Sequence, residues 1–282
     1  MNKRRIMLAA GALVLAGAGL APVWLKQPPR RAILIGAAGA MKELLALQAA
    51  QFMQQHPEVD ITIEPGDSLQ AWLALVGGSI DIAAMVRNLS LDEENENLYQ
   101  AMIAREYIAI IVHPKSEVVN LSQQQVYDLL SGQIQNWQYA GGPVAPVHVI
   151  SRIQESTTRR FVEARILRGG HVSNQAIEVA TAQQMLEQVA ADPHALGFIA
   201  LKDLNAQSQN PNQDQFRQLK IDGVAISNKR VLTGRYPYTR SLYLLRESQQ
   251  SGLAAAFIEF ACSPAGQKIV VEQGLIPVHA IL

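Results

Sequence analysis

Four polar residues that lie close together in the sequence have the chemistry of an oxyanion site: Arg152, Ser156, Thr157 and Thr158. A β-branched run at residues 147–150 precedes them and predicts a strand, and the hydroxyl residues open a predicted helix. The first turn of a helix has unpaired backbone N–H groups and the positive end of the helix dipole, which favour a bound anion. The hydroxyls can add donors, and the guanidinium offers a planar fork of N–H groups that matches phosphate or carboxylate oxygens.

A second interpretation of these residues is purely structural. Serine and threonine are ordinary helix N-caps, so Ser156 or Thr157 could do no more than cap the helix while Arg152 lies on the surface. The residues alone leave both interpretations open.

Two earlier turns have the same strand–turn–helix layout. A predicted strand at residues 32–35 leads into Gly-Ala-Ala-Gly-Ala at 36–40 and a helix through Gln55, and a strand at 59–64 leads through a turn to Ser68 at the start of a helix. This alternation predicts an α/β architecture with parallel sheets, whose ligands bind at the carboxyl ends of the strands. All three turns would lie there, although small residues at such a turn are also routine for packing.

The amino-terminal residues 1–29 are predicted to be an addressing segment rather than part of the fold. A basic start is followed by an almost wholly apolar stretch at residues 6–25, which predicts export. Small residues at 16–18 and 19–21 offer cleavage sites, and we expect a cleaved signal peptide. The alternative is an uncleaved membrane anchor, because an apolar run of about 20 residues can span a bilayer.

Charge and residue spacing exclude several classes of function. Removing residues 1–31 leaves 18 basic against 24 acidic side chains, a net charge of −6, so a nucleic-acid partner is not expected. The six histidines are scattered without metal-ligand spacing, and no nucleophile elbow is present. We therefore expect neither a metal, nor a cofactor, nor an enzyme.

Motifs spread over the chain resemble the phosphate-binding proteins that serve ABC importers. Arg152, a gap of three residues and then residues 156–159 resemble the family's Arg-x-x-x-Ser-Gly-Thr-Arg segment, with Thr157 in place of the glycine. Further segments that resemble family motifs are 121–137, Leu196-Gly197-Phe198, Asp222-Gly223-Val224, 233–243 with its Tyr236-Pro237 and Arg240, and Ser263-Pro264-Ala265-Gly266-Gln267.

The resemblance implies a two-lobed α/β periplasmic-binding-protein fold with the ligand in a cleft between the lobes. Two chain crossings would join the lobes, with residues 32–108 and 241–282 in lobe one and 109–240 in lobe two. The implied ligand groups are the backbone of Gly39, Ala40 and Met41 together with Ser68, Arg152, Ser156, Thr157 and Thr158.

Several positions depart from the family pattern. Ala37, Ala38 and Ala40 leave the first turn without hydroxyls, Val86 stands where the family has a Ser or Asp ligand, and Gln154 replaces an acidic residue seen in some members. Such a carboxylate accepts a hydrogen bond from the protonated oxygen of phosphate and repels sulfate. Leaving that proton unpaired in a dry site costs about 1–3 kcal/mol, so the choice between phosphate and another oxyanion stays open.

Our first interpretation is an exported solute-binding protein that captures phosphate, or a related oxyanion, between two lobes for an ABC importer. Its partner would be an ABC permease in the inner membrane, and we expect a periplasmic monomer. The alternative is a diverged, membrane-tethered sensor or interaction protein of the same fold without a transport role.

Overall fold

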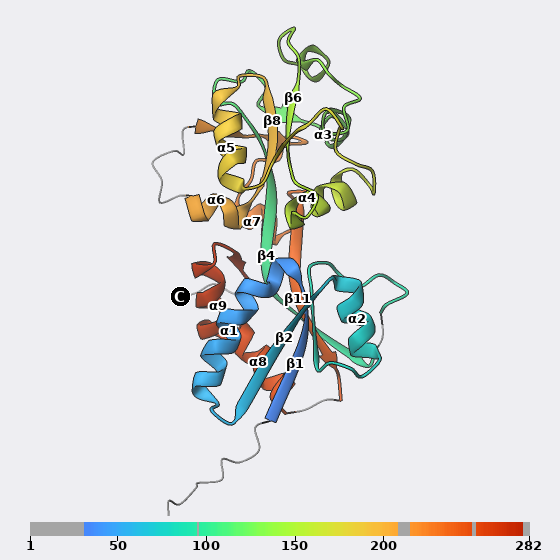
Figure 1. The fold of residues 1–282 in the computed structure, drawn as a ribbon, viewed down its shortest axis with the longest axis vertical. Coiled ribbons are helices and arrows are strands. Elements are labelled where there is room, and N and C mark those ends of the chain that lie inside the picture. The colour runs from blue at the N-terminus through green and yellow to red at the C-terminus, as the bar shows by residue number, and fades with distance from the viewer. Residues whose placement is uncertain (1–30, 95, 208–214, 250–251, 279–282) are drawn as a thin grey trace, which may run out of the picture.

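The computed structural model describes residues 31–94, 96–207, 215–249 and 252–278. The addressing segment predicted at residues 1–29 lies outside this part of the chain. Within the described part, no helix is long and apolar enough to cross a membrane. These residues form an α/β fold of two lobes, which lie one above the other and are joined by two long strands (Figure 1).

Three parallel strands form the centre of the first lobe. They are β1 (Arg31–Ala38), β2 (Val59–Gly66) and β3 (Ile82–Met85), with β1 in the middle. The second half of β1 and all of β3 are buried, as expected of parallel strands that are covered on both faces. Because the strands run in register, their carboxyl ends meet at one edge of the sheet.

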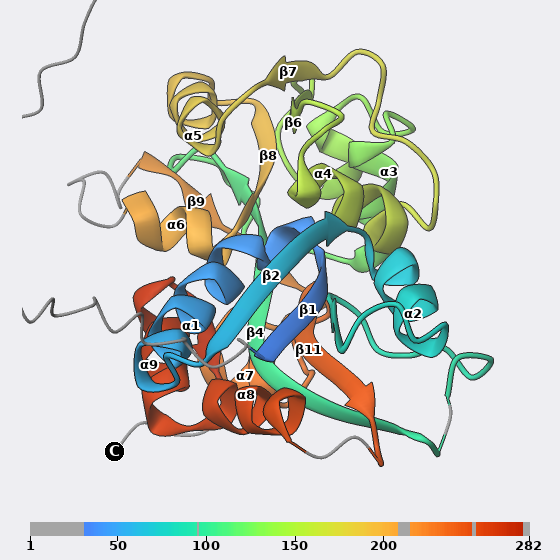
Figure 2. The same cartoon turned by 60° about the horizontal axis from the view of Figure 1, so that its bottom comes forward.

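Helices cover both faces of this sheet. Helix α1 (Lys42–Gln55) packs with α8 (Leu253–Cys262) and α9 (Pro264–Glu272) on one face, while α2 (Ser68–Val76) covers the other (Figure 2). The apolar side of α1 meets Phe257 of α8, whose ring lies edge-on to Phe52 with ring centroids 5.5 Å apart.

Strands β4 (Leu98–Val112) and β11 (Thr239–Glu247) connect the two lobes. They pair antiparallel over the length of β11, from Thr239↔Tyr107 to Glu247↔Leu98. In the first lobe β11 pairs with β3, and in the second lobe the end of β4 pairs with β8 (Ala195–Ala200). The crossing strands thus belong to both halves of one continuous sheet.

The second lobe continues the sheet beyond β4 in the order β8-β6-β7, with β6 (His148–Arg152) and β7 (Ile177–Val179). Its helices are α3 (Gln123–Leu130), α4 (Thr157–Phe161) with the π-helical turn η3 (Val162–Ile166), α5 (Ala182–Ala191), α6 (Leu201–Gln207) and α7 (Asn228–Leu232). One apolar cluster fills this lobe, and separate clusters fill the first.

Short elements complete the described fold. They are η1 (Gly39–Met41), β5 (Asn120–Leu121), η2 (Trp137–Ala140), β9 (Arg217–Gln218), β10 (Lys220–Ile221) and β12 (Ile276–Pro277).

The predicted α/β architecture is confirmed, and the predicted elements agree with the structure except at some ends. Helix α1 ends at Gln55, and the strand predicted at 59–64 is extended by two residues. The larger difference is at residues 36–38, predicted as a turn, which remain in β1. They do so because β1 keeps its pairing with β2 up to Ala38↔Gly66.

Candidate anion-binding site

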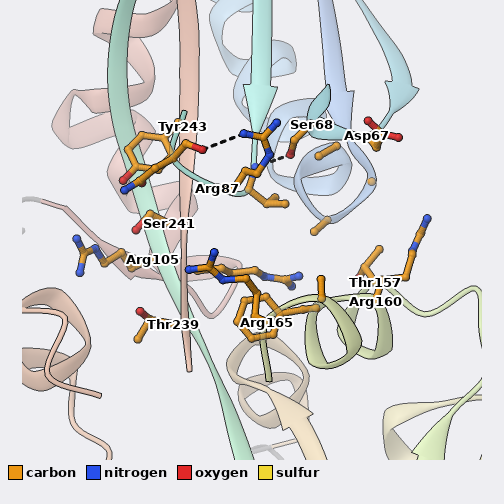
Figure 3. A pocket seen from close by; sticks show the side chains of 18 of the residues that line it. Asp67, Ser68, Arg87, Arg105, Thr157, Arg160, Arg165, Thr239, Ser241 and Tyr243 are labelled. Carbon is orange, nitrogen blue, oxygen red and sulfur yellow. Dashed lines mark hydrogen bonds between the residues drawn. The ribbon is translucent and has the colours of Figure 1, made fainter. Parts of the chain in front are cut away.

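A cavity of about 700 Å³ lies between the lobes, beside the crossing strands (Figure 3). One wall consists of the turns that follow β1, β2 and β3, and the opposite wall consists of α4 and η3. Side chains of β4 and β11 complete the lining.

The register of the parallel strands brings the first wall together. Ala37 of β1 lies opposite Pro65 of β2 and Ala84 of β3, so the chain leaves all three strands at the same place. Gly39 and Ala40 follow β1 in the turn η1, and both line the cavity.

Ser68 also lines this wall, where it opens helix α2. The carboxylate of Asp67 caps the helix, since its Oδ1 accepts hydrogen bonds from the backbone N–H groups of Leu69 at 2.8 Å and Gln70 at 2.9 Å. The Ser68 hydroxyl accepts a hydrogen bond from the N–H of Val86 at 3.1 Å, which ties the start of α2 to the end of β3. The hydroxyl proton remains available for a ligand.

Thr157 faces the first turn from the opposite lobe. Its methyl carbon lies 3.7 Å from the place that a Cβ atom would take at Gly39. Ser156 caps α4, and its hydroxyl accepts a hydrogen bond from the N–H of Arg159 at 3.4 Å. Residues more than a hundred positions apart in the sequence therefore meet across this cavity.

Arg152 is the last residue of β6. It lies behind the wall that α4 and η3 form, outside the lining of the cavity. Its side chain is 16% exposed; one terminal nitrogen donates to the carbonyl of Ala180 at 2.9 Å, and the other lies 4.0 Å from Asp203. Its Nε is buried and has no hydrogen-bond partner among the described residues. Arg159 donates to the Arg152 carbonyl at 2.9 Å and so fixes the backbone there.

Asp203 is a half-buried neighbour of this guanidinium. Burial raises the pKa of Asp203, and the charges of Lys202, Arg152 and Arg240 oppose that rise. Asp203 and Arg152 therefore stand close in a region where water screens their charges poorly.

The sequence-predicted residues fall into two groups. Gly39, Ala40, Ser68 and Thr157 line the cavity. Met41 and Thr158 are buried, Ser156 is the cap of α4, and Arg152 lies behind the wall.

The cavity also contains five arginines that sequence reasoning did not assign to the site: Arg87, Arg105, Arg160, Arg165 and Arg240. Arg240 lies inside the motif at 233–243, and Arg87 follows Val86, where the family has a ligand, so the sequence offers a signal for both. Nothing in the sequence distinguished the other three from solvated surface arginines.

Two of these arginines are neutralised by carboxylates. Arg87 forms a two-pronged pair with Glu93, with Nη2 2.6 Å from Oε1, and this hydrogen bonding lowers the pKa of Glu93 to about 2. Arg240 is buried against Glu106, with Nε 2.6 Å from Oε2.

The other three have no such partner within the described residues. Arg105 donates to the carbonyl of Val231 at 2.8 Å, and Arg160 donates to that of Glu155 at 3.3 Å, but neither they nor Arg165 form an ion pair there. Asp67 supplies the single carboxylate in the lining that the structure describes. The cavity is therefore positively charged and suits an anion.

Two lobes that are joined by two strands and enclose a cavity define the class of the protein. The chain belongs to the PBP superfamily, whose domain matches residues 25–265.

Its relatives include the phosphate-binding protein PstS of Bacillus subtilis, with 27% identity over 252 residues that make up 87% of this chain and 80% of the relative. Two solved structures share the fold. An ABC-type phosphate transport receptor from Vibrio cholerae has a TM-score of 0.79 at 24% identity and covers 87% of this chain and 99% of its own. PstS from Borrelia burgdorferi has a TM-score of 0.78 at 20% identity, and the match covers 89% of this chain and 100% of the Borrelia chain.

Proposed function

We propose that this protein is a solute-binding protein that captures inorganic phosphate, or a closely related oxyanion, between its lobes for an ABC importer. The observation that carries the proposal is the meeting of Gly39 and Thr157 from opposite lobes at a positively charged cavity. A relative whose match covers 87% of this chain is named a phosphate-binding protein, which supports phosphate as the anion.

In the proposed complex, backbone N–H groups supply much of the binding. The turn from Gly39 through Ala40 to Met41 offers its amides from lobe one, since Ala40 has no hydroxyl to add and the Met41 side chain is buried. The Ser68 hydroxyl completes this half of the site. An anion held by fixed amides needs little side-chain reorganisation.

The other half of the proposed ligand set comes from the start of α4 and the end of β6. Ser156, Thr157 and Thr158 supply amides and hydroxyls, and Arg152 supplies the charge. The unpartnered Nε of Arg152 supports this role, because an anion would satisfy a buried donor that otherwise lacks an acceptor. Arg152 lies in the same lobe as the start of α4, so its side chain would reach the anion by changing its own conformation.

Closure would occur about the crossing strands β4 and β11. We propose that residues 32–108 with 241–282 move as lobe one and residues 109–240 as lobe two, as in other hinged binding proteins. The separate apolar clusters of the two halves support such rigid bodies.

The proposed setting is the periplasm, with an ABC permease in the inner membrane as partner and the protein acting as a monomer. Binding without turnover fits a site rich in donors, and the relatives are named as binding proteins rather than enzymes.

Calorimetry tests the proposal. The exported chain is freed of bound anion by mild unfolding and dialysis, refolded, and titrated separately with phosphate and sulfate. Micromolar or tighter phosphate binding, with no heat from sulfate, is the expected result. A folded protein that gives no heat with either anion would contradict the proposal and favour the tethered, non-transporting alternative. Mass spectrometry of the intact exported protein would test that alternative, because a tethered protein would retain its amino-terminal segment.

A further inference from the structure

A second group of anion-binding side chains lies on the crossing strands. Ser241 of β11 is paired with Arg105 of β4, and directly paired residues of antiparallel strands project from the same face. Thr239 is two residues from Ser241 and shares that face. All three line the cavity, and in the view of Figure 3 Arg165 lies between them and Thr157.

These residues are not needed by the proposed phosphate site. That site uses Arg152 and the turns at Gly39 and Ser68, whereas Arg105 and Arg165 lie in the cavity itself without a carboxylate partner among the described residues. The only described carboxylate of the lining, that of Asp67, already accepts two backbone hydrogen bonds. The cavity therefore has more positive charge than one small anion would offset.

The size of the cavity agrees with this surplus. Pockets of about 300–1,000 Å³ hold organic ligands with several functional groups, and this one has about 700 Å³. Closure of the lobes would reduce the volume but would also expel water from around the guanidinium groups. Their mutual repulsion grows as water leaves, unless a second anionic group lies between them.

We propose that the cavity binds a small phosphorylated ligand with a second anionic group. Its phosphate would lie at Gly39, Ser68 and Thr157, and its second phosphate or carboxylate would be held by Arg105, Arg165 and the hydroxyls of Thr239 and Ser241. The inference rests on the proposed phosphate site and names a wider class of solute for it.

The test is calorimetry of the exported chain with phosphate, inorganic diphosphate and phosphonoacetate. Diphosphate tests a second phosphate and phosphonoacetate tests a carboxylate. We expect at least one of them to bind more tightly than phosphate. Arg165→Ala should weaken that ligand about tenfold or more, the size of one lost charge-assisted hydrogen bond, and should change phosphate affinity less than about threefold. Arg165 is exposed, so this variant should fold.

Lys220→Ala is the matched control, because it removes one exposed positive charge from the same lobe outside the cavity lining. It should leave the affinities for all three ligands unchanged. If phosphate binds and both larger anions bind more weakly, the inference is wrong while the proposed function stands. The inference is also wrong if Arg165→Ala lowers the affinities for phosphate and for the larger ligand by the same factor. The arginine would then act only by non-specific electrostatic attraction of anions. Failure of all three ligands would overturn both proposals.

Discussion

Arg240 of the crossing strands and the arginines of the α4–η3 wall line the same cavity but differ in burial and in pairing. Arg240 of β11 is 4% exposed and paired with Glu106 of the neighbouring strand, which is 1% exposed. Arg160 and Arg165 of the wall are exposed and have no carboxylate partner among the described residues. A buried, paired charge contributes to the geometry of the fold, whereas an exposed, unpaired one is free to bind. Changes to the buried Glu106–Arg240 pair should therefore affect stability, whereas changes to the arginines without a carboxylate partner among the described residues should affect binding.

The largest effect is expected in the crossing strands. Glu106→Ala would leave the Arg240 guanidinium buried without its carboxylate, which typically costs about 3–5 kcal/mol. Urea denaturation should show this loss in the free energy of unfolding. Glu106→Gln is the matched control, because it keeps a hydrogen-bond acceptor and should lose less. A loss below about 1 kcal/mol in Glu106→Ala would mean that the pair does not hold the two strands.

Arg152→Ala should produce the largest effect on binding. Loss of a hydrogen bond to a charged group costs about 1.5–3 kcal/mol, which is roughly a ten- to hundredfold weaker phosphate affinity in calorimetry. Arg152→Lys keeps the charge but loses the fork of N–H groups, so it should recover only part of the affinity. Unchanged binding in Arg152→Ala would remove this residue from the ligand set.

The Arg87–Glu93 pair predicts a pH dependence of stability. The folded-state pKa of Glu93 is lowered from 4.5 to about 2, chiefly by the hydrogen bond from Arg87. Its contribution is therefore fully present above the unfolded-state pKa and is lost as the pH falls from about 5 towards 2, by on the order of 1–2 kcal/mol. Glu93→Gln should flatten the stability profile over this range, whereas Glu94→Gln, at an exposed neighbour, should leave it unchanged. Profiles of equal slope in both variants would argue against the pair.

The smallest effect concerns the hydroxyl of Thr157, a residue that lines the cavity at the start of α4. Thr157→Val keeps the shape of the side chain and removes its donor, which should weaken phosphate binding by about two- to tenfold in calorimetry. Thr157→Ser, which keeps the hydroxyl, should bind nearly as the natural protein does. If the valine variant binds as well as the serine variant, the backbone alone holds the anion on this side.

Sequence reasoning found the local features and missed the long-range ones. The strand at 59–64, the helix ending at Gln55 and the cap at Ser156 depend on neighbouring residues, and all are present. The pair of Glu106 with Arg240 joins residues 134 positions apart, so no local pattern could predict it.

The cavity arginines were missed for the same reason. In the sequence Arg105, Arg160 and Arg165 resemble solvated surface residues, and only the pairing of β4 with β11 and the folding of α4 over β6 bring them to one cavity. Conversely, the family resemblance implies Arg152 as a ligand, but spacing in the sequence cannot show that its side chain lies outside the lining of the cavity.

A crystal structure of the exported chain grown with phosphate tests the central claim most directly. We expect a phosphate ion between the turn at Gly39 and the start of α4 at Thr157, with the lobes closed and Arg152 in contact with it. A phosphate bound elsewhere on the protein, or a site at Gly39 that stays empty at saturating phosphate, would contradict it.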